Sequence, residues 1–252
     1  MMMDDHRLAH DLAARAGDLL LALRHRDGGP GELRAAGDRG SHEFLASQLS
    51  RLRPGDVVLS EEGRDDPARL TADRVWIVDP LDGTREFGER DRTDWAVHVA
   101  LWERGALTAG AVALPAQGRV LSTAQPPAAP PPPEPGRPVR VLVSRTRPPV
   151  FLERLAERIE VTLIPMGSAG AKAAAVISGD ADAYLHSGGQ YEWDSAAPAA
   201  VAQAAGLHTS RLDGSPLAYN QVNPSLPDIL ICPAGLAATL LDCLRAVDCS
   251  AV

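Results

Sequence analysis

Two aspartates three positions apart, Asp79 and Asp82, give the sequence its clearest chemical signal. They lie in "WIVDPLDGTREF" (residues 76–87), and the four apolar residues "VWIV" (75–78) that lead into Asp79 predict the end of a buried strand. Pro80 predicts that the strand stops there and that a turn brings Asp82 back beside Asp79. Two carboxylates that close repel each other unless one is protonated or a cation lies between them. The hypothesis is a hard divalent cation such as magnesium, with the carbonyl of Leu81 as a further ligand; the alternative is a tight turn that carries acids by chance.

Gly83 and Thr84 follow the aspartates directly and are expected to begin a short helical segment. The first backbone amides of a helix have no partner inside it, so they would hold a phosphate oxygen. The stretch "DPLDGT" therefore combines candidate metal ligands with a candidate phosphate site.

Three further acidic stretches lie at the expected ends of strands or helices: Asp38 in "AAGDRG", Glu61 with Glu62 in "LSEEG", and Asp194 in "EWDSAA". Each has an ordinary structural explanation when it is considered alone. Asp38 could cap a helix that begins at Ser41, the glutamate pair could be a solvated turn, and Asp194 could cap the helix of "SAAPAAVAQAAG". Only a fold that gathers these acids around Asp79 and Asp82 would make them a site.

The apolar pattern before the proline-rich segment predicts an α+β arrangement that positions most of these acids. Strand patterns there end at Ser60 and at Pro80, and two strands flank the Arg104–Gly105 turn with apolar residues dense enough for a central sheet. The expected helices cover residues 4–26 and about 41–52.

The stretch "AQPPAAPPPPEPGRP" (residues 124–138) is the one low-complexity segment of the chain. Its prolines favour an extended surface loop or linker, with an SH3-type ligand as the alternative. Beyond it strands and helices alternate, which is typical of an α/β arrangement. We therefore expect an N-terminal α+β half (1–123) with most metal ligands, the proline-rich loop (124–138), and a C-terminal α/β half (139–252) with the last metal ligand and most substrate contacts. The elements expected in the C-terminal half are strands at 139–144, 161–166, 181–186 and 228–234, and helices at about 150–159, 169–179 and 195–206.

Composition excludes several classes of protein. The net charge is −8, aromatic residues are 4% of the chain, and no basic stripe is present, so a nucleic-acid partner is not expected. No window approaches the roughly 18 apolar residues of a membrane span, and acids stand where a signal peptide needs a basic segment, so we expect a cytoplasmic protein. The three cysteines, Cys232, Cys243 and Cys249, lack the spacing of a disulfide framework or a zinc site.

Taken together and in this order, "EE", "DPLDGT", "GSAGAK" and "WDSAA" resemble the inositol monophosphatase superfamily of magnesium-dependent, lithium-sensitive phosphatases. The resemblance covers nearly all of the chain and implies a layered αβαβα sandwich of the inositol monophosphatase/fructose-1,6-bisphosphatase type. Within the superfamily, "DGTREF" and "VSRTR" look more like the CysQ group, the 3'(2'),5'-bisphosphate nucleotidases.

The resemblance implies roles for the acidic residues. Asp38 and Thr84 would position or deprotonate the attacking water, and Glu61 would join them as a catalytic residue while it also binds metal. The family often has "PVTxAD" before this aspartate, whereas the present stretch is "LRAAGD". Two or three magnesium ions would be bound, with inhibition by lithium, through Glu61, Asp79, the Leu81 carbonyl, Asp82 and Asp194.

The implied substrate contacts lie in four segments. "GSAGAK" is one residue longer than the nucleotidase pattern "GSSLK", so its lysine aligns only with a small insertion. At residue 186 a histidine stands where related nucleotidases often have arginine, and with an unperturbed pKa of about 6.5 it would hold a phosphate less strongly. The residues concerned are Gly83, Thr84, Ser144, Arg145, Ser168, Lys172 and His186.

The expected activity is therefore hydrolysis of 3'-phosphoadenosine 5'-phosphate to AMP and phosphate, in sulfate assimilation. The precursor 3'-phosphoadenosine 5'-phosphosulfate is a further candidate substrate. An inositol monophosphatase or fructose-1,6-bisphosphatase is the alternative, because the "GSSLK" pattern is not clean. An inactive nucleotide- or metal-sensing protein is a third interpretation. Such a protein would be expected to lack a metal ligand, and none of the expected ligands is missing here. The sequence leaves open whether the chain forms a homodimer.

Overall fold

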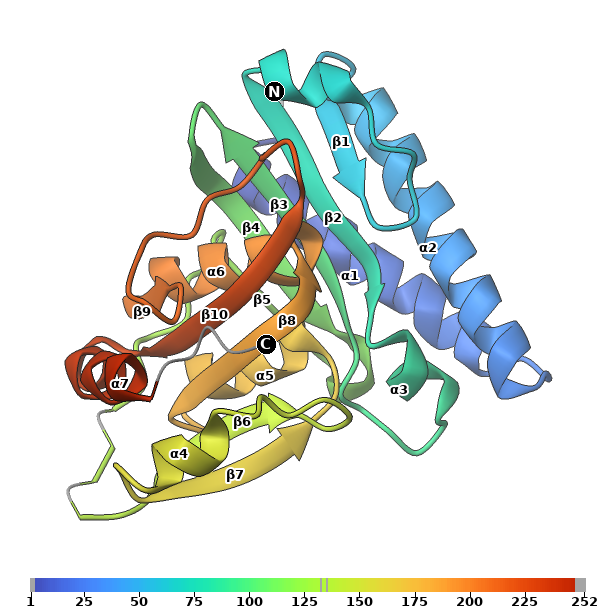
Figure 1. The fold of residues 1–252 in the computed structure, drawn as a ribbon. Coiled ribbons are helices and arrows are strands. Elements are labelled where there is room, and N and C mark those ends of the chain that lie inside the picture. The colour runs from blue at the N-terminus through green and yellow to red at the C-terminus, as the bar shows by residue number, and fades with distance from the viewer. Residues whose placement is uncertain (1–2, 132, 135, 248–252) are drawn as a thin grey trace.

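The protein is a five-layer sandwich of helices and two β-sheets in a computed structural model that describes residues 3–131, 133–134 and 136–247. Helices α1 (Asp5–Arg24) and α2 (Pro30–Leu52) cover the outer face of the first sheet. Helices α5 (Ala169–Ile177) and α6 (Glu192–Ala204) lie between the two sheets (Figure 1). The outer face of the second sheet is covered by α4 (Leu152–Ala156) and α7 (Ala234–Ala246).

The first sheet has the order β1-β2-β3-β4-β5 and is mixed, because β1 pairs with β2 in parallel and the other pairs are antiparallel. The predicted hairpin between β3 and β4 is present. Arg104 (φ 47°) and Gly105 (φ 96°) both adopt the positive φ that a tight two-residue turn between twisted strands needs. The strands are β1 (Val57–Ser60), β2 (Arg74–Asp82), β3 (Ala96–Glu103), β4 (Ala106–Leu114) and β5 (Arg119–Ser122).

The prediction that Pro80 ends its strand is wrong. Strand β2 continues to Asp82, with a shift in its pairing to β3 between Asp79 and Asp82. Proline lacks an amide to donate, and an irregularity in the ladder is the position where a strand tolerates this loss. The bulge still turns both aspartates toward the same site.

The second sheet has the order β7-β6-β8-β10-β9. It is mixed, since β6 is parallel to β7 and β8, whereas β10 is antiparallel to β8 and β9. The strand expected to end at residue 186 continues to Tyr191, and β9 was not expected. The strands are β6 (Val139–Ser144), β7 (Val161–Met166), β8 (Ala183–Tyr191), β9 (Leu207–Ser210) and β10 (Ser225–Pro233).

Two predicted helices begin earlier than expected. Helix α2 starts at Pro30, where proline fits the first helical turn and Glu32 accepts a hydrogen bond from the Gly29 amide (3.0 Å). Asp38 therefore lies inside the helix, and the alternative that it caps a helix from Ser41 is wrong. Helix α6 likewise begins at Glu192, which places Asp194 in its first turn instead of at its N-cap.

Helix α7 was not predicted from the sequence pattern. The remaining helical segments are short. Helix α4 covers only part of the predicted 150–159. The short segments are α3 (Thr84–Gly88), η1 (Pro67–Thr71) and η2 (Pro115–Gln117).

Both faces of the first sheet are buried. Along β2, Val75 and Ile77 face α5 and α6, whereas Trp76 and Val78 face α1 and α2. The layer between the sheets is built largely from alanines, and a Cβ on Gly110 would come within 2.7 Å of Ala200 Cβ. In the same layer, the end of β2 and the start of β3 lie against the first turns of α5 and α6.

The two sheets are built from the two predicted halves, and the proline-rich segment runs between β5 and β6. Arg137 ties the end of this segment to Asp182 (Nη1–Oδ2 2.6 Å). That each half is a domain of its own stays a prediction. In the described chain, no helix has both the length and the apolar composition of a membrane span. Cys232 and Cys243 are free thiols, and Cys249 lies outside the described residues.

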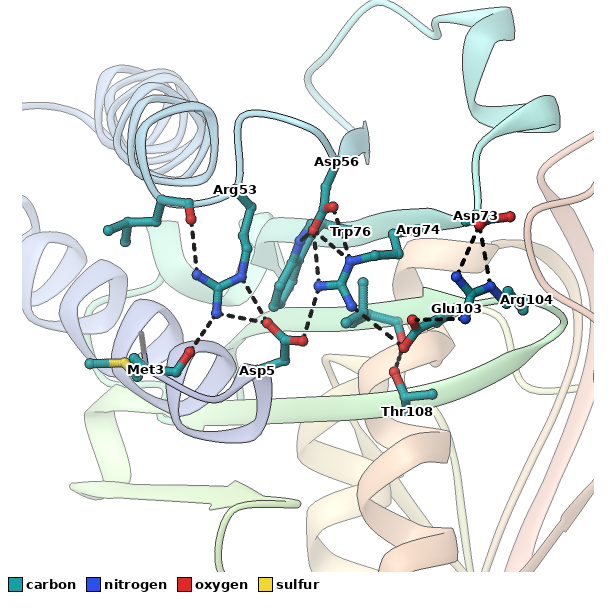
Figure 2. Close-up of polar contacts among 12 residues, drawn as sticks. Met3, Asp5, Arg53, Asp56, Asp73, Arg74, Trp76, Glu103, Arg104 and Thr108 are labelled. Carbon is teal, nitrogen blue, oxygen red and sulfur yellow. Dashed lines mark hydrogen bonds and ion pairs between the residues drawn. The ribbon is translucent and has the colours of Figure 1, made fainter. Parts of the chain in front are cut away.

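A charged network joins the first helix to the start of β2 (Figure 2). Arg74 contacts the carboxylates of Asp5 (2.9 Å), Asp56 (3.0 Å) and Glu103 (3.4 Å). Arg53 contacts Asp5 as well (2.8 Å). The acids at this end of the strand are therefore matched by arginines.

Candidate active site

Three carboxylates meet at the other end of β2. One oxygen from each of Asp79, Asp82 and Asp194 lies within 4.8 Å of the other two. The backbone holds two of the three side chains: Asp79 Oδ1 accepts a hydrogen bond from the Leu81 amide (3.0 Å), and Asp194 Oδ2 accepts one from the Tyr191 amide (2.7 Å). The fold thus gathers acids that are more than 100 positions apart in the sequence.

Glu61 joins this cluster because β1 is the parallel neighbour of β2, so that the residue after Ser60 emerges beside Asp79. The residue as a whole is exposed, but protein surrounds its carboxyl closely enough to remove water from it. This desolvation, together with repulsion from Asp194 and Asp82, raises the pKa of Glu61 to about 7. Its carboxyl lies within hydrogen-bonding reach of Asp79.

In the described part of the chain, three acids of this group, Glu61, Asp79 and Asp194, lack a lysine or arginine counter-charge. Burial and the neighbouring carboxylates raise the pKa of Asp79 well above its usual range, and raise that of Asp194 to about 6. A bound cation would reverse these directions, because it favours the ionised carboxylates.

Asp82 is the exception, since three donors converge on one of its oxygens. Oδ2 accepts hydrogen bonds from the Ser168 hydroxyl and the Gly170 amide (2.7 Å), and His98 Nε2 lies 3.2 Å away. Burial alone would raise the pKa of Asp82, but the charge of His98 and these hydrogen bonds lower it to about 2. With Oδ2 occupied, Oδ1 is the oxygen left for a ligand.

Asp38 and Thr84, which were predicted to act together on water, do lie together. The Thr84 hydroxyl is 3.1 Å from Asp38 Oδ1 and 3.0 Å from the Leu81 carbonyl, so its single proton is shared between two acceptors. Burial, followed by repulsion from Glu62, raises the pKa of Asp38 to about 6.

A cavity of about 420 Å³ adjoins the acidic cluster. Its walls come from α3, from the segments after β6 and β7, and from β8, so that both sheets contribute. All seven residues predicted to contact the substrate line it: Gly83, Thr84, Ser144, Arg145, Ser168, Lys172 and His186.

The positively charged residues that line this cavity differ in burial and in their ion-pair partners. Lys172 is only 4% exposed; its ammonium donates to the carbonyls of Gly167 and Ser168 (2.8 Å for Ser168), and burial lowers its pKa to about 8. Arg145 is engaged by Glu86 (2.6 Å) and Glu89 (3.1 Å). Arg147, which sequence reasoning missed, lines the cavity without an ion pair in the described part of the chain.

His186 does not supply a charge at neutral pH. Its Nε2 lies 2.7 Å from the Gly188 carbonyl, which can only accept, so Nε2 carries the proton. Burial lowers the pKa of the ring to about 4. The predicted weakness of His186 as a phosphate anchor is therefore consistent with its surroundings.

Close packing explains why "GSAGAK" has glycine at positions 167 and 170. A Cβ on Gly167 would lie 2.4 Å from Glu86 Cγ, and one on Gly170 would lie 2.1 Å from His98 Nε2. Only glycine lets this loop approach α3 and β3 so closely. His98 was also missed, although a polar residue within the apolar run "AVHVAL" is a signal that could have found it.

The donor set fits a hard divalent cation. Carboxylate and carbonyl oxygens are the ligands that magnesium and calcium prefer, and soft donors do not occur among Glu61, Asp79, Asp82, Asp194 and the Leu81 carbonyl. The acidic cluster could therefore hold a metal ion.

The chain belongs to the inositol monophosphatase family, whose pattern it matches over residues 7–239. It is 52% identical over 257 aligned residues to a Mycobacterium leprae protein named 3'-phosphoadenosine 5'-phosphate phosphatase, with 97% of this chain and 95% of that protein covered. It is 34% identical over 201 residues to the Escherichia coli protein named 3'(2'),5'-bisphosphate nucleotidase CysQ, with 73% and 78% covered. The crystal structure of CysQ from Bacteroides thetaiotaomicron has the same fold (TM-score 0.76, 26% identity, 91% and 97% covered). The predicted family and layered fold are confirmed.

Proposed function

We propose that this chain is a metal-dependent phosphatase that hydrolyses the 3'-phosphate of 3'-phosphoadenosine 5'-phosphate, giving AMP and phosphate. One observation carries the proposal: an acidic cluster in which Asp79 and Asp194 have no lysine or arginine partner among the described residues adjoins a cavity that also carries Lys172 and Arg147. The acids suit metal ions at the phosphate that is cut, and the cations suit a second phosphate that stays on the nucleotide. The names of the M. leprae and E. coli relatives support the same activity.

The metal ligands in this proposal are Glu61, Asp79, Asp82, Asp194 and the carbonyl of Leu81. Two or three magnesium ions bound there would supply the positive charge that stabilises the attacking and departing oxygens in phosphoryl transfer, and lithium is expected to inhibit. The N-terminal half would thus provide four of these five ligands, and the C-terminal half would provide Asp194 and most substrate contacts.

The attacking water would be oriented by Thr84 and Asp38. In an in-line displacement the water oxygen would bond to phosphorus as the bond from phosphorus to the ribose O3' breaks. One water proton would pass to the Asp38 carboxylate, and O3' would leave with the bonding electron pair and take a proton from solvent to become the 3'-hydroxyl of AMP. The raised pKa of Asp38, about 6, suits a base that works near neutral pH.

The 5'-phosphate would be held by Lys172 and Arg147. Arg145 serves differently in this proposal, because Glu86 and Glu89 already neutralise it and hold it as part of the cavity wall. A cytoplasmic role in clearing this by-product of sulfate assimilation follows from the substrate, and 3'-phosphoadenosine 5'-phosphosulfate is a second candidate with the same 3'-phosphate.

Comparing phosphate release from three substrates under magnesium tests the proposal: 3'-phosphoadenosine 5'-phosphate, inositol 1-phosphate and fructose 1,6-bisphosphate. We expect kcat/KM to be highest for the nucleotide. Arg147→Ala should raise KM for the nucleotide by about 10-fold or more, because a charge-assisted hydrogen bond to phosphate is worth about 1.5–3 kcal/mol. Arg158→Ala, a change of a surface arginine outside the cavity, is the matched control. Equal or reversed substrate preference would overturn the assignment of the nucleotide.

A further inference from the structure

His98 is a buried, titratable residue that the proposed reaction does not use. It lies on β3 directly opposite Asp79, with 0% of its surface exposed. Ala96 and Ala100, on the same face of β3, pack in the layer between the sheets, so the ring of His98 faces that layer. Nε2 lies 3.2 Å from Asp82 Oδ2, and Nδ1 lies 3.0 Å from the carbonyl of Trp193. The ring thus bridges two segments that are far apart in the sequence.

Both partner atoms of the ring are acceptors. A carbonyl oxygen cannot donate, so Nδ1 must carry a proton to bond with Trp193. A bare lone pair on Nε2 would face a carboxylate oxygen and repel it, so Nε2 carries a proton as well. The Nε2 contact is an ion pair without the alignment of a hydrogen bond, and the Nδ1 contact is a hydrogen bond.

The surroundings leave the ring no room to move. Gly170 packs against Nε2 so closely that a Cβ there would lie 2.1 Å from it and 3.0 Å from Ala96 Cβ. The same glycine donates its amide to Asp82 Oδ2 (2.7 Å). His98, Gly170 and Ser168 therefore enclose one oxygen of Asp82 from three sides.

The two contacts of the His98 ring lead to two different members of the acidic cluster. Asp82 comes from the bulge of β2, and Trp193 immediately precedes Asp194 in the first turn of α6. No other described residue contacts the Asp82 carboxylate through one side-chain atom and the backbone next to Asp194 through another. A change at His98 would therefore alter the separation of the Asp82 and Asp194 carboxylates without removing either acid.

We infer that His98 is a positioning residue that fixes Asp82 relative to Asp194 and thereby sets the affinity of the acidic cluster for a divalent cation. It contacts neither the cavity nor the water-orienting pair. The inference rests on the metal site of the proposed function. Partners of this kind, which touch a metal ligand and not the metal, typically contribute 10–100-fold in metal affinity.

The two contacts of the ring can be removed separately. The side-chain amide of asparagine reaches about as far as Nδ1, so His98→Asn keeps a donor toward the Trp193 carbonyl and loses the one toward Asp82. The amide of glutamine reaches about as far as Nε2, so His98→Gln does the reverse. His98→Leu removes both donors. His10→Asn is the control, because the one hydrogen bond of the His10 ring to the described residues is with Ser122 (3.1 Å), away from the cluster.

The affinity for Mn²⁺ can be measured without any turnover. Mn²⁺ is added to the metal-free protein, and the loss of the paramagnetic resonance signal of the free ion reports how much of it is bound. We expect His98→Asn and His98→Gln each to weaken Mn²⁺ binding about 10-fold and His98→Leu about 100-fold. Melting curves establish that each variant is folded, and the Asn and Gln variants decide the question if the Leu variant does not fold.

Wild-type affinity in a folded Asn or Gln variant would overturn the role of His98. If the wild-type protein itself bound no Mn²⁺, the metal site of the proposed function would fail instead. A second check uses Asp82→Asn as background: because His98 acts through Asp82, adding His98→Asn there should weaken binding by less than about 3-fold, well below its effect in the wild type. Full additivity of the two changes would contradict the inference.

Discussion

Strand β2 has a cluster of acids at each end, and the two clusters differ in their counter-charges. At its start, Arg74 and Arg53 contact Asp5, Asp56 and Glu103 (Figure 2). At its end, Asp79 and Asp194 have no arginine or lysine partner among the described residues. Acidic residues are therefore structural at one end and are left free to bind a cation at the other.

The pKa values of the acids follow this difference. Burial would raise the pKa of Asp5, but hydrogen bonds and charge from Arg53 and Arg74 lower it. Burial also raises the pKa of Asp79, and there the neighbouring Glu61, Asp82 and Asp194 raise it further. In this protein, the group of acids that the fold places without arginine partners is the candidate metal site.

The largest expected effect is at Asp79. Asp79→Asn should lower kcat by about 1,000-fold or more, because the loss of a metal ligand removes much of the electrostatic stabilisation of the transition state. The metal-free variant should melt at or above the wild-type temperature, since one repelling charge is gone. Phosphate release and melting curves measure the two effects.

Asp56→Asn is the matched control at the other end of the strand. It removes a carboxylate from Arg74, so it should lower the melting temperature and leave kcat within about 2-fold of the wild type. If Asp79→Asn kept wild-type turnover, the distinction between the two clusters would be wrong.

A smaller effect, on stability alone, is expected at Arg74. Arg74→Met leaves partly buried carboxylates of Asp5 and Asp56 without their partner, which should cost about 2 kcal/mol. For a chain of this size that corresponds to a fall in melting temperature of about 4–8 °C. Unchanged stability would show that the network of Figure 2 contributes little to folding.

The smallest effect concerns pH and Glu61. Its folded pKa, about 7, lies above the usual value of 4.5, so the fold favours the protonated form. The corresponding stability is present at acidic pH and is lost as the pH rises from about 4.5 through 7. Metal-free wild-type protein should therefore melt lower at pH 8 than at pH 5, through this group.

Glu61→Gln should reduce that pH dependence and raise the melting temperature at pH 8 by about 2 °C. Adding magnesium to the wild type should remove the deficit at pH 8, whereas the variant should respond less. Melting curves at pH 5 and pH 8, with and without magnesium, measure all four conditions. Parallel pH profiles for the wild type and the variant would contradict the raised pKa.

Much of the site could be predicted because its residues lie in short sequence motifs. The acids follow short apolar runs that end at Ser60 and Val78, and the order of four motifs identified the family. The seven predicted substrate contacts all line one cavity, where the end of β2 in the first sheet meets β6, β8 and the start of α5 from the second half of the chain.

Other features depended on contacts between distant segments. The path of β2 through Pro80 is set by pairing with β3, and the early start of α2 at Pro30 resembled a glycine-proline loop in the sequence. The bridge by His98 joins Asp82 to Trp193, which lies 111 positions later in the sequence. Arg147 stood out as the unpaired arginine of the cavity, among the described residues, only once Arg145 was seen to pair with Glu86 and Glu89.

An anomalous difference map from crystals of the protein grown with Mn²⁺ tests directly whether the acids at the end of β2 bind a cation. We expect manganese peaks among Asp79, Asp82 and Asp194, and none among Asp5, Asp56 and Glu103 at the start of the same strand. Absence of manganese from the three aspartates, or its presence at the arginine-paired cluster, would contradict this expectation.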